Sequence, residues 1–306
     1  MATGVLMLTG PTAAGKTALA MQVAERFDAE IVGADSRQVY RDMPIGTAAP
    51  SAAEQARVAH HLVGFLDPRE RYSAARFVGD ALDAIAEIQA RGRRPLVVGG
   101  TGFYLRALAG DVTLSPLRDD DLRARLAREA RVHAPEVLHA WLTALAPQRA
   151  GALAPGDRYR VARALEIALA EREDAEATRR DESVPRSLRA LGIPFRKVYL
   201  AVDPATLEQR IAARVDAMLA GGFLEEAERT GGSAVAADAV GYREALAYLA
   251  GWSNQVELRI ALIRATRRYA KRQATWFRRE PELLRVPPAG AFDDVSAVAA
   301  ALPGWS

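Results

Sequence analysis

The chain has 306 residues, half of them hydrophobic, and a formal net charge of +3 at pH 7, which predicts a globular protein with room for two domains. No apolar run approaches the roughly 18 residues of a membrane-spanning helix, and we expect no signal peptide. Because cysteine is absent, disulfides and cysteine-ligated zinc are excluded, which fits the cytoplasm; the four scattered histidines do not suggest a metal cluster.

The first hundred residues alternate between strand and helix patterns. Short apolar runs predict strands at 4–9, 30–34 and 95–99, and a helical pattern covers 18–27. A long amphipathic helix is predicted from Ser73 to just before Gly92. Short apolar strands separated by helices predict an α/β fold with a parallel sheet covered on both faces.

The segment GPTAAGKT, residues 10–17, follows the first predicted strand and precedes the first helix. It has the spacing of a phosphate-binding loop, in which glycines let backbone N–H groups surround an anion. Lys16 would add positive charge, and the Thr17 hydroxyl could ligate Mg²⁺. A chance match in a loop is the alternative, but the order of strand, loop and helix favours a site for a phosphate chain.

Two further segments follow predicted strands and should lie at the same edge of the sheet. Asp35 follows the second strand, where its carboxylate could accept a proton or organise Mg²⁺-bound water; a turn or helix-cap role is the alternative. The third strand ends in the glycine-rich segment 99–102, without the acidic residue that many P-loop ATPases have there. Hydrolysis of ATP is therefore poorly supported. The glycines would allow a ligand to approach closely, or simply form a tight turn.

From residue 115 to 189 no strand pattern occurs, and helices are predicted at 119–132, 135–145 and 157–172. We interpret this segment as an all-helical insertion domain between two parts of a P-loop NTPase-like core, residues 1–114 and 190–306. Residues 171–187, with mixed charges and Pro185, are predicted to be a loose connection.

The strand pattern resumes at 197–202, followed by a helix at 204–220. Arg210 and Arg214 lie one turn apart on that helix and could face the same way. Arg214 could reach a diphosphate as a second cation, or both could form surface salt bridges. Two helices are predicted after Gly241, then a strand at 283–286 and a helix at 293–301.

The second of these helices, predicted at 256–274, is strongly basic. Residues 254–280 contain eight arginine or lysine residues against two glutamates, although lysine occurs only three times in the chain. Tyr269, Trp276 and Phe277 are interleaved with the cations. This pattern suits an RNA backbone with bases stacked on aromatic rings. A solvated basic face with aromatic side chains in the core is the alternative.

Together these motifs resemble the tRNA dimethylallyltransferase family, also called tRNA isopentenyltransferases, over nearly the whole chain. The matching segments are GPTAAGKTALA, ADSRQVYRDMPIGTAAPS, HHLVGFLDP, YSAARF, VGGTGFYLRAL, AVGYRE and YAKRQATWFRR. The sequence departs from the family's pattern at Ala49, where lysine is frequent, and at Ala14, where serine is frequent.

The resemblance implies transfer of a dimethylallyl group from dimethylallyl diphosphate to the exocyclic amine of the adenine 3′ of the tRNA anticodon (position 37), giving N6-dimethylallyladenosine and diphosphate. It implies that Asp35 accepts the amine proton, and that Lys16, Thr17 with Mg²⁺, and Arg214 stabilise the leaving diphosphate. Open alternatives are an adenylate isopentenyltransferase that acts on free AMP, a P-loop kinase for small molecules and a non-catalytic RNA-binding NTPase.

By the same resemblance, the donor diphosphate is expected to contact Gly10, Pro11, Thr12, Ala13, Ala14, Gly15, Lys16, Thr17 and Arg214. The tRNA is expected to contact Asp35, Ser36, Arg37, Gln38, Thr101, Arg123, Tyr159, Arg160, Arg163, Val240, Gly241, Tyr242, Arg243, Lys271, Arg272, Gln273, Trp276, Phe277 and Arg278. The helical insertion would lie against the anticodon stem. We expect a monomer whose partners are tRNA and dimethylallyl diphosphate, with no membrane involved.

Overall fold

A parallel sheet of six strands forms the framework of the larger part of the chain. The computed structural model describes residues 3–112, 114, 120–176 and 186–306. The strands are β1 (Val5–Thr9), β2 (Ala29–Gly33), β3 (His60–His61), β4 (Arg94–Gly99), β5 (Phe195–Leu200) and β6 (Leu283–Val286). Their order is β3-β2-β4-β1-β5-β6, and all neighbouring pairs are parallel. The predicted fold class and five predicted strands are confirmed. β3 was not predicted, because two residues carry no periodic signal.

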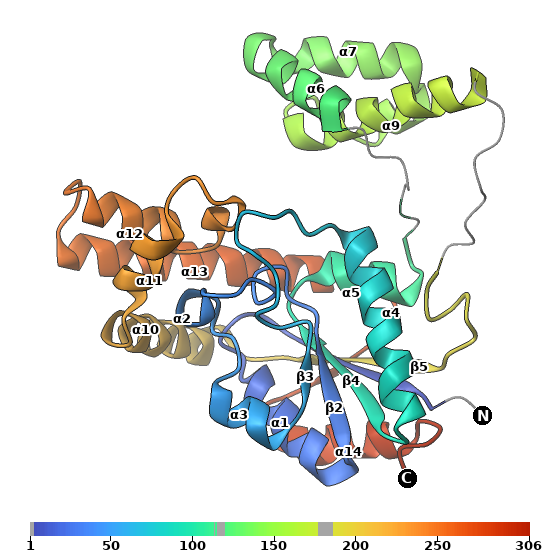
Figure 1. The fold of residues 1–306 in the computed structure, drawn as a ribbon, viewed down its shortest axis with the longest axis vertical. Coiled ribbons are helices and arrows are strands. Elements are labelled where there is room, and N and C mark those ends of the chain that lie inside the picture. The colour runs from blue at the N-terminus through green and yellow to red at the C-terminus, as the bar shows by residue number, and fades with distance from the viewer. Residues whose placement is uncertain (1–2, 113, 115–119, 177–185) are drawn as a thin grey trace. The chain divides into compact units, whose positions relative to one another are not determined.

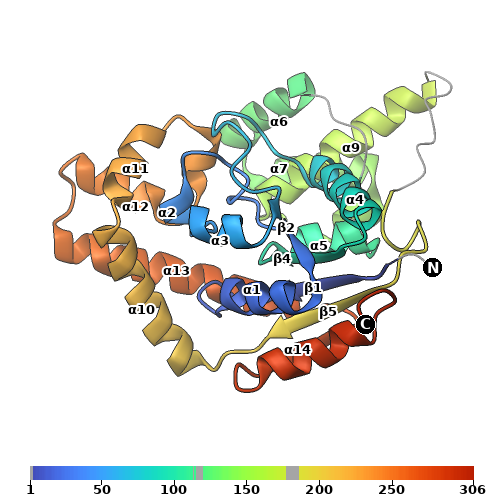
Figure 2. The same ribbon diagram turned by 60° about the horizontal axis from the view of Figure 1, so that its bottom comes forward.

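Helices cover both faces of this sheet (Figures 1 and 2). On one face, α1 (Lys16–Phe27) packs against α14 (Ala291–Ala300), and both share a core with Leu6 and Leu8 of β1. The alternate residues Val5 and Met7 point to the other face because side chains alternate along a strand. There α4 (Ala74–Ala90) packs on the sheet and on α5 (Gly102–Ala109).

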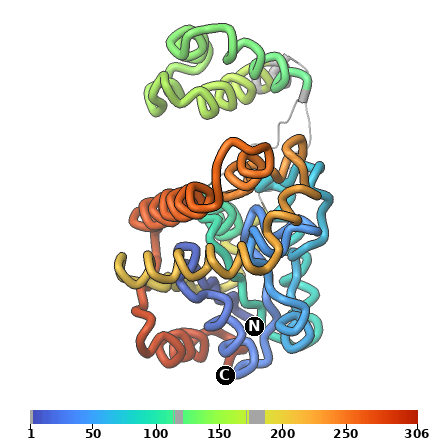
Figure 3. The backbone as a smooth tube through the Cα atoms, turned by 90° about the vertical axis from the view of Figure 1, so that its left-hand side faces the viewer, coloured from blue at the N-terminus to red at the C-terminus, as the bar shows by residue number. Residues whose placement is uncertain are grey.

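A second group of helices lies next to the carboxyl ends of the strands. It contains α2 (Pro44–Thr47), α10 (Pro204–Ala220), α11 (Phe223–Thr230), the 3₁₀ helix η1 (Val235–Asp238), α12 (Tyr242–Leu249) and α13 (Gln255–Phe277). The short helix α3 (Ala52–Arg57) lies instead beside α1 (Figure 1). Figure 3 shows α10 and α13 next to each other. Their buried faces form a separate core with Met43, Phe223 and Tyr242. Asn254 and Glu257 form a capping box that starts α13.

The remaining unit spans residues 113–184, and its described part is mainly helical. It contains α6 (Asp120–Val132), α7 (Pro135–Leu145), α8 (Pro147–Gly151) and α9 (Arg158–Glu176) around a small leucine-rich core. The three predicted helices are confirmed, and α8 was not predicted.

The boundaries of the helical unit differ from the predicted ones at its carboxyl end. Residues 186–189 belong to the core unit, because Leu188 is fully buried and its backbone N–H donates to the Leu108 carbonyl at 2.9 Å. The predicted loose connection is wrong at residues 171–176, which continue α9. Residues 177–185 lie outside the described residues. No described helix is long and apolar enough to cross a membrane.

Candidate active site

The predicted phosphate-binding loop connects β1 to α1 and opens towards a cavity. Gly15 has a φ of 97° and Ala13 a φ of 62°, both in the left-handed region. Gly15 caps α1, so the first N–H groups of that helix follow directly after the loop. A helix N-terminus carries partial positive charge and unpaired N–H groups, which favours an anion at this position.

Lys16 is the first residue of α1 and directly follows Gly15 of this loop. Its ammonium donates to the carbonyls of Gly10 at 3.0 Å and Pro11 at 2.8 Å. An ammonium has three protons, so one remains for a phosphate oxygen. Burial lowers the pKa of Lys16 to about 8; the Asp35 carboxylate opposes this shift and Arg214 adds to it. The Asp35 carboxylate therefore balances the positive charge of Lys16 only in part until an anion binds.

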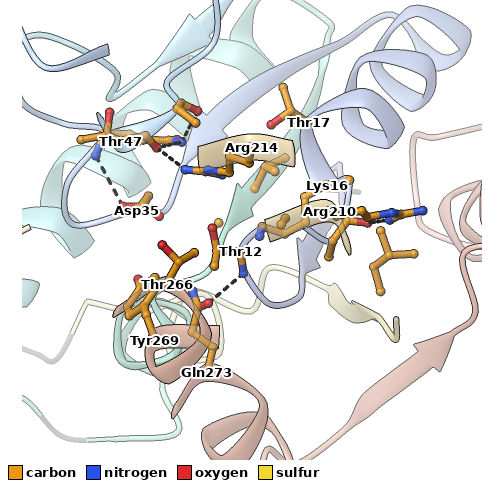
Figure 4. A pocket seen from close by; sticks show the side chains of 18 of the residues that line it. Thr12, Lys16, Thr17, Asp35, Thr47, Arg210, Arg214, Thr266, Tyr269 and Gln273 are labelled. Atoms are coloured by element: carbon orange, nitrogen blue, oxygen red, sulfur yellow. Dashed lines mark hydrogen bonds between the residues drawn. The ribbon is translucent and has the colours of Figure 1, made fainter. Parts of the chain in front are cut away.

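Asp35 lies directly after β2 and faces the same cavity (Figure 4). Its Oδ1 accepts the backbone N–H of Arg37 at 2.9 Å and that of Gln38 at 3.4 Å, which closes a turn. The Ser36 N–H donates to the Thr101 hydroxyl at 3.0 Å. Oδ1 thus fixes the turn, while Oδ2 has no hydrogen-bond donor among the described residues.

The two arginines of α10 line the same cavity and bind different groups. Arg214 lies near Asp35 and donates to the Thr47 carbonyl at 3.5 Å, whereas Arg210 donates to the Ala14 carbonyl of the loop at 2.8 Å (Figure 4). Burial lowers the pKa of Arg214, and the Asp35 carboxylate and Tyr269 oppose that shift. Arg214 is thus a second cation in the cavity, close to Asp35, and no ion pair of either arginine occurs among the described residues.

The glycine-rich turn after β4 is closely packed, which is one of its two expected roles. A Cβ on Gly100 would clash with Gln273 Nε2 of α13, and one on Gly102 would clash with the Trp276 indole. A Cβ on Gly99 would clash with the Ala34 backbone. The glycines therefore serve the packing of helix against turn. No acidic residue follows β4 in the turn 99–102, as the sequence indicated.

Gln273 connects the two loops. Its Oε1 accepts the Thr12 N–H at 2.8 Å, and its Nε2 donates to the Gly100 carbonyl at 3.0 Å. A neutral amide thus joins the phosphate-binding loop to the end of β4. This contact fixes the loop from α13, more than 250 residues away in sequence.

A buried glutamate supports the cavity from the side of α2. Glu226 is fully buried and accepts the N–H groups of Ile45 and Gly46 at 2.8 and 2.7 Å and the Tyr242 hydroxyl at 2.7 Å. The other end of α2 presents the Thr47 carbonyl, which accepts from Arg214 and from the Gln38 amide at 3.1 Å. Glu226 therefore holds α2, and the Thr47 carbonyl of α2 orients the side chains of Arg214 and Gln38.

These elements enclose a cavity of about 850 Å³ at the carboxyl edge of the sheet. It is lined by the loop residues 12–17, by residues 35–38 and 46–48, and by Arg210, Arg214, Asp238, Thr266, Tyr269, Arg272 and Gln273. Loop, cations and carboxylate thus face one space large enough for a diphosphate and a planar ring. Thr17 and Asp35 offer the hard oxygen ligands that Mg²⁺ prefers, although no cluster of three or more metal-ligating side chains occurs among the described residues.

Comparison with known sequences decides the family. A sequence model described as IPP transferase matches residues 38–280, and one described as isopentenyl transferase matches residues 3–63. This chain belongs to the IPP transferase family. A relative named tRNA dimethylallyltransferase from Geobacter sulfurreducens is 41% identical over 97% of this chain and 96% of its own. Another of that name, from Bordetella petrii, is 46% identical over 92% and 91%.

Solved structures agree with this assignment. The tRNA isopentenylpyrophosphate transferase of Bacillus halodurans matches with a TM-score of 0.66 and 33% identity, covering 97% of this chain and 99% of that one. A eukaryotic dimethylallyltransferase acting on tRNA matches with a TM-score of 0.73 and 27% identity, covering 97% of this chain and 77% of that one. The IPP transferase fold thus extends over nearly the whole chain.

The residues predicted to contact tRNA fall into three groups in this member of the family. Residues 35–38 and Val240 line the cavity, and Arg243, Lys271, Arg272 and Arg278 are exposed. Tyr242 and Phe277 have no exposed surface, and Gln273 has 6%. These three side chains carry internal contacts, and contact of tRNA with any of the predicted residues stays a prediction. Gly241 is the left-handed cap of α12, with a φ of 99°.

In the helical unit, a buried glutamate organises the predicted cations. Glu166 is 2% exposed and pairs with Arg123 at 3.1 Å and with Arg163 at 2.5 Å. Tyr159 and Arg160 are exposed, and the tyrosine retains 81% of its surface. Contact of this face with tRNA stays a prediction.

Sequence reasoning missed Glu226 and the cavity residues Thr266 and Asp238. Glu226 had a signal, because it shares one helical face with Phe223 and Ala227 at i, i+3, i+4 spacing. A charged residue on such an apolar face is expected to have buried partners.

Proposed function

We propose that this chain is a tRNA dimethylallyltransferase, which joins the dimethylallyl group of dimethylallyl diphosphate to the exocyclic amine of adenine 37 of tRNA. The observation that carries the proposal is the cavity itself, where an anion-binding loop with Lys16 and Arg214 faces the carboxylate of Asp35. The names of the curated relatives and the tRNA-modifying structural neighbours support the same reaction.

In this reaction a bond forms between the adenine N6 atom and C1 of the dimethylallyl group, while the bond from C1 to the diphosphate oxygen breaks. The bonding electrons leave with the diphosphate. The loop N–H groups, Lys16 and Arg214 lie where that negative charge develops, so they stabilise it without reorganising. Asp35 takes the proton that the amine loses, and Oδ2 is its available atom. Base catalysis of this kind contributes about 10²–10⁴-fold.

Mg²⁺ fits this donor set as a proposed cofactor. The Thr17 hydroxyl and the diphosphate oxygens would hold it, with water completing its coordination. When bound, the ion supplies further stabilisation of the leaving group. We also propose that this protein is a monomer and that it acts in the cytoplasm.

The direct test incubates the full chain with dimethylallyl diphosphate, Mg²⁺ and unmodified tRNA and analyses the nucleosides by mass spectrometry. We expect prenylated adenosine and stoichiometric diphosphate, and formation of both about 10²–10⁴-fold slower with Asp35→Asn. ATP with the same RNA should release no phosphate above background. Prenylation of free AMP at a comparable kcat/KM, or release of phosphate from ATP that depends on Asp35, would contradict the proposal.

A further inference from the structure

An exposed aromatic ring with no role in the reaction above lies close to Thr101, whose hydroxyl accepts the Ser36 N–H. Phe103 lies on the first turn of α5, two residues after Thr101, and is 40% exposed. Its neighbours Tyr104 and Leu105 are buried against the core. Helical geometry therefore places Phe103 on the outer face of α5, two residues after the Thr101 contact with the loop that carries Asp35.

The ring rests on a tightly held tryptophan. Its centroid lies 6.4 Å from that of Trp276, with the two planes at 86°. Gly102 leaves no room for a Cβ against the indole, and the Arg106 guanidinium lies 5.0 Å from the indole centroid. Arg106 is itself fixed by Glu280 at 2.6 Å. Trp276 thus contacts Phe103, Gly102 and Arg106, and it supports the Phe103 ring from one side.

The end of α13 that carries Trp276, the residue on which this ring rests, is basic. Lys271, Arg272 and Arg278 are exposed on the same end of α13 as Trp276. Within the described part of the chain, no carboxylate lies within 4.0 Å of any of these three cations. An exposed aromatic ring supported by a helix end with unpaired cations matches single-stranded nucleic acid, in which a base stacks and the phosphates meet the positive charge.

We propose that Phe103 is a stacking platform for a second nucleobase of the anticodon loop, a neighbour of the adenine that enters the cavity. The proposal rests on the proposed function for the identity of the RNA. Stacking on Phe103 would hold the adjacent nucleotide outside the cavity, and thereby keep the target base unstacked from it. Phe103 is then a binding residue and takes no part in proton transfer.

The test measures binding of the unmodified anticodon stem-loop, without donor, to Phe103→Ala, Phe103→Leu and Phe103→Tyr. We expect Kd to rise about 5- to 100-fold for the alanine and leucine variants, since base–aromatic stacking contributes about 1–3 kcal/mol. The Kd of the tyrosine variant should stay within about twofold of that of the wild-type protein. Trp252→Ala, which removes a ring that is 83% exposed before the opposite end of α13, is the matched control and should not weaken binding.

Two further readouts separate stacking from a merely structural effect. The slope of log Kd against log salt should be unchanged in Phe103→Leu, because no charge is removed. A 2-aminopurine placed at each loop position in turn should report quenching at one neighbour of the target adenine, and Phe103→Leu should relieve it there. If Phe103→Leu binds like the unmodified chain, or Trp252→Ala weakens binding equally, the platform is refuted. Because no donor is present, these results hold even if the transfer reaction fails.

Discussion

The lowered pKa of Lys16 predicts that binding of the donor weakens steeply above pH 8. With a pKa of about 8 in the free protein, roughly nine-tenths of the Lys16 side chains are charged at pH 7 and roughly one-tenth at pH 9. A bound diphosphate favours the charged form, so it raises the pKa and binding takes up a proton. The Kd for dimethylallyl diphosphate should therefore rise about tenfold between pH 7 and pH 9.

Isothermal titration calorimetry of the donor, without tRNA, measures this effect directly. Titrations in buffers with different ionisation enthalpies should show an uptake approaching one proton at pH 9 and close to none at pH 7. The donor itself adds little to the trend, because the second ionisation of a phosphate group lies near about pH 6.

Lys16→Arg is the matched control, since a guanidinium stays charged throughout this range. Its donor affinity should be nearly independent of pH between 7 and 9, whatever its absolute value. A proton uptake near zero at pH 9 in the unmodified chain would refute the reasoning, because it would mean that Lys16 does not change its charge when the anion binds.

Three further changes test other parts of the site. Asp35→Asn keeps an acceptor for the Arg37 N–H and should lower kcat by about 10²–10⁴-fold, while Kd for tRNA in a filter-binding assay changes less than about twofold. Lys271→Ala with Arg272→Ala should reduce the slope of log Kd for tRNA against log salt by about two; an unchanged slope would place these cations away from the RNA. Glu226→Ala should lower the free energy of unfolding by about 3 kcal/mol or more, since three buried donors lose their acceptor. Urea denaturation measures this loss. A change below about 1 kcal/mol would contradict the role of Glu226 as the buried acceptor that holds α2.

The loop, the sheet and Asp35 could be predicted because each has a local signal. The spacing from Gly10 to Thr17 is a contiguous pattern, and the apolar runs of β1, β2 and β4 repeat at short range. Parallel topology then brings the ends of these strands to one edge, which is why Asp35 was placed correctly without knowledge of any contact.

The supporting contacts could not be predicted, because they join segments that are distant in sequence. Glycines at 99–102 suit either a ligand or a close-packed helix, and only the position of α13 decides between them. The same holds for Gln273, a polar residue on a basic helix whose amide turned out to bridge Thr12 and Gly100. The composition of α13 predicted an RNA-binding face, and the packing divides that helix into exposed cations and buried supports.

That packing also explains how a P-loop can serve a reaction other than hydrolysis. At the end of β4, where many P-loop ATPases carry an acidic residue, this chain has glycines covered by the neutral Gln273 amide. In the described part of the cavity lining, the carboxylates are Asp35 and Asp238, against five lysine and arginine side chains. Asp238 pairs with Arg37 at 2.9 Å, which leaves Asp35 as the carboxylate available for the proposed proton transfer. A single base facing a surplus of fixed cations favours departure of a diphosphate with loss of a proton from the incoming amine.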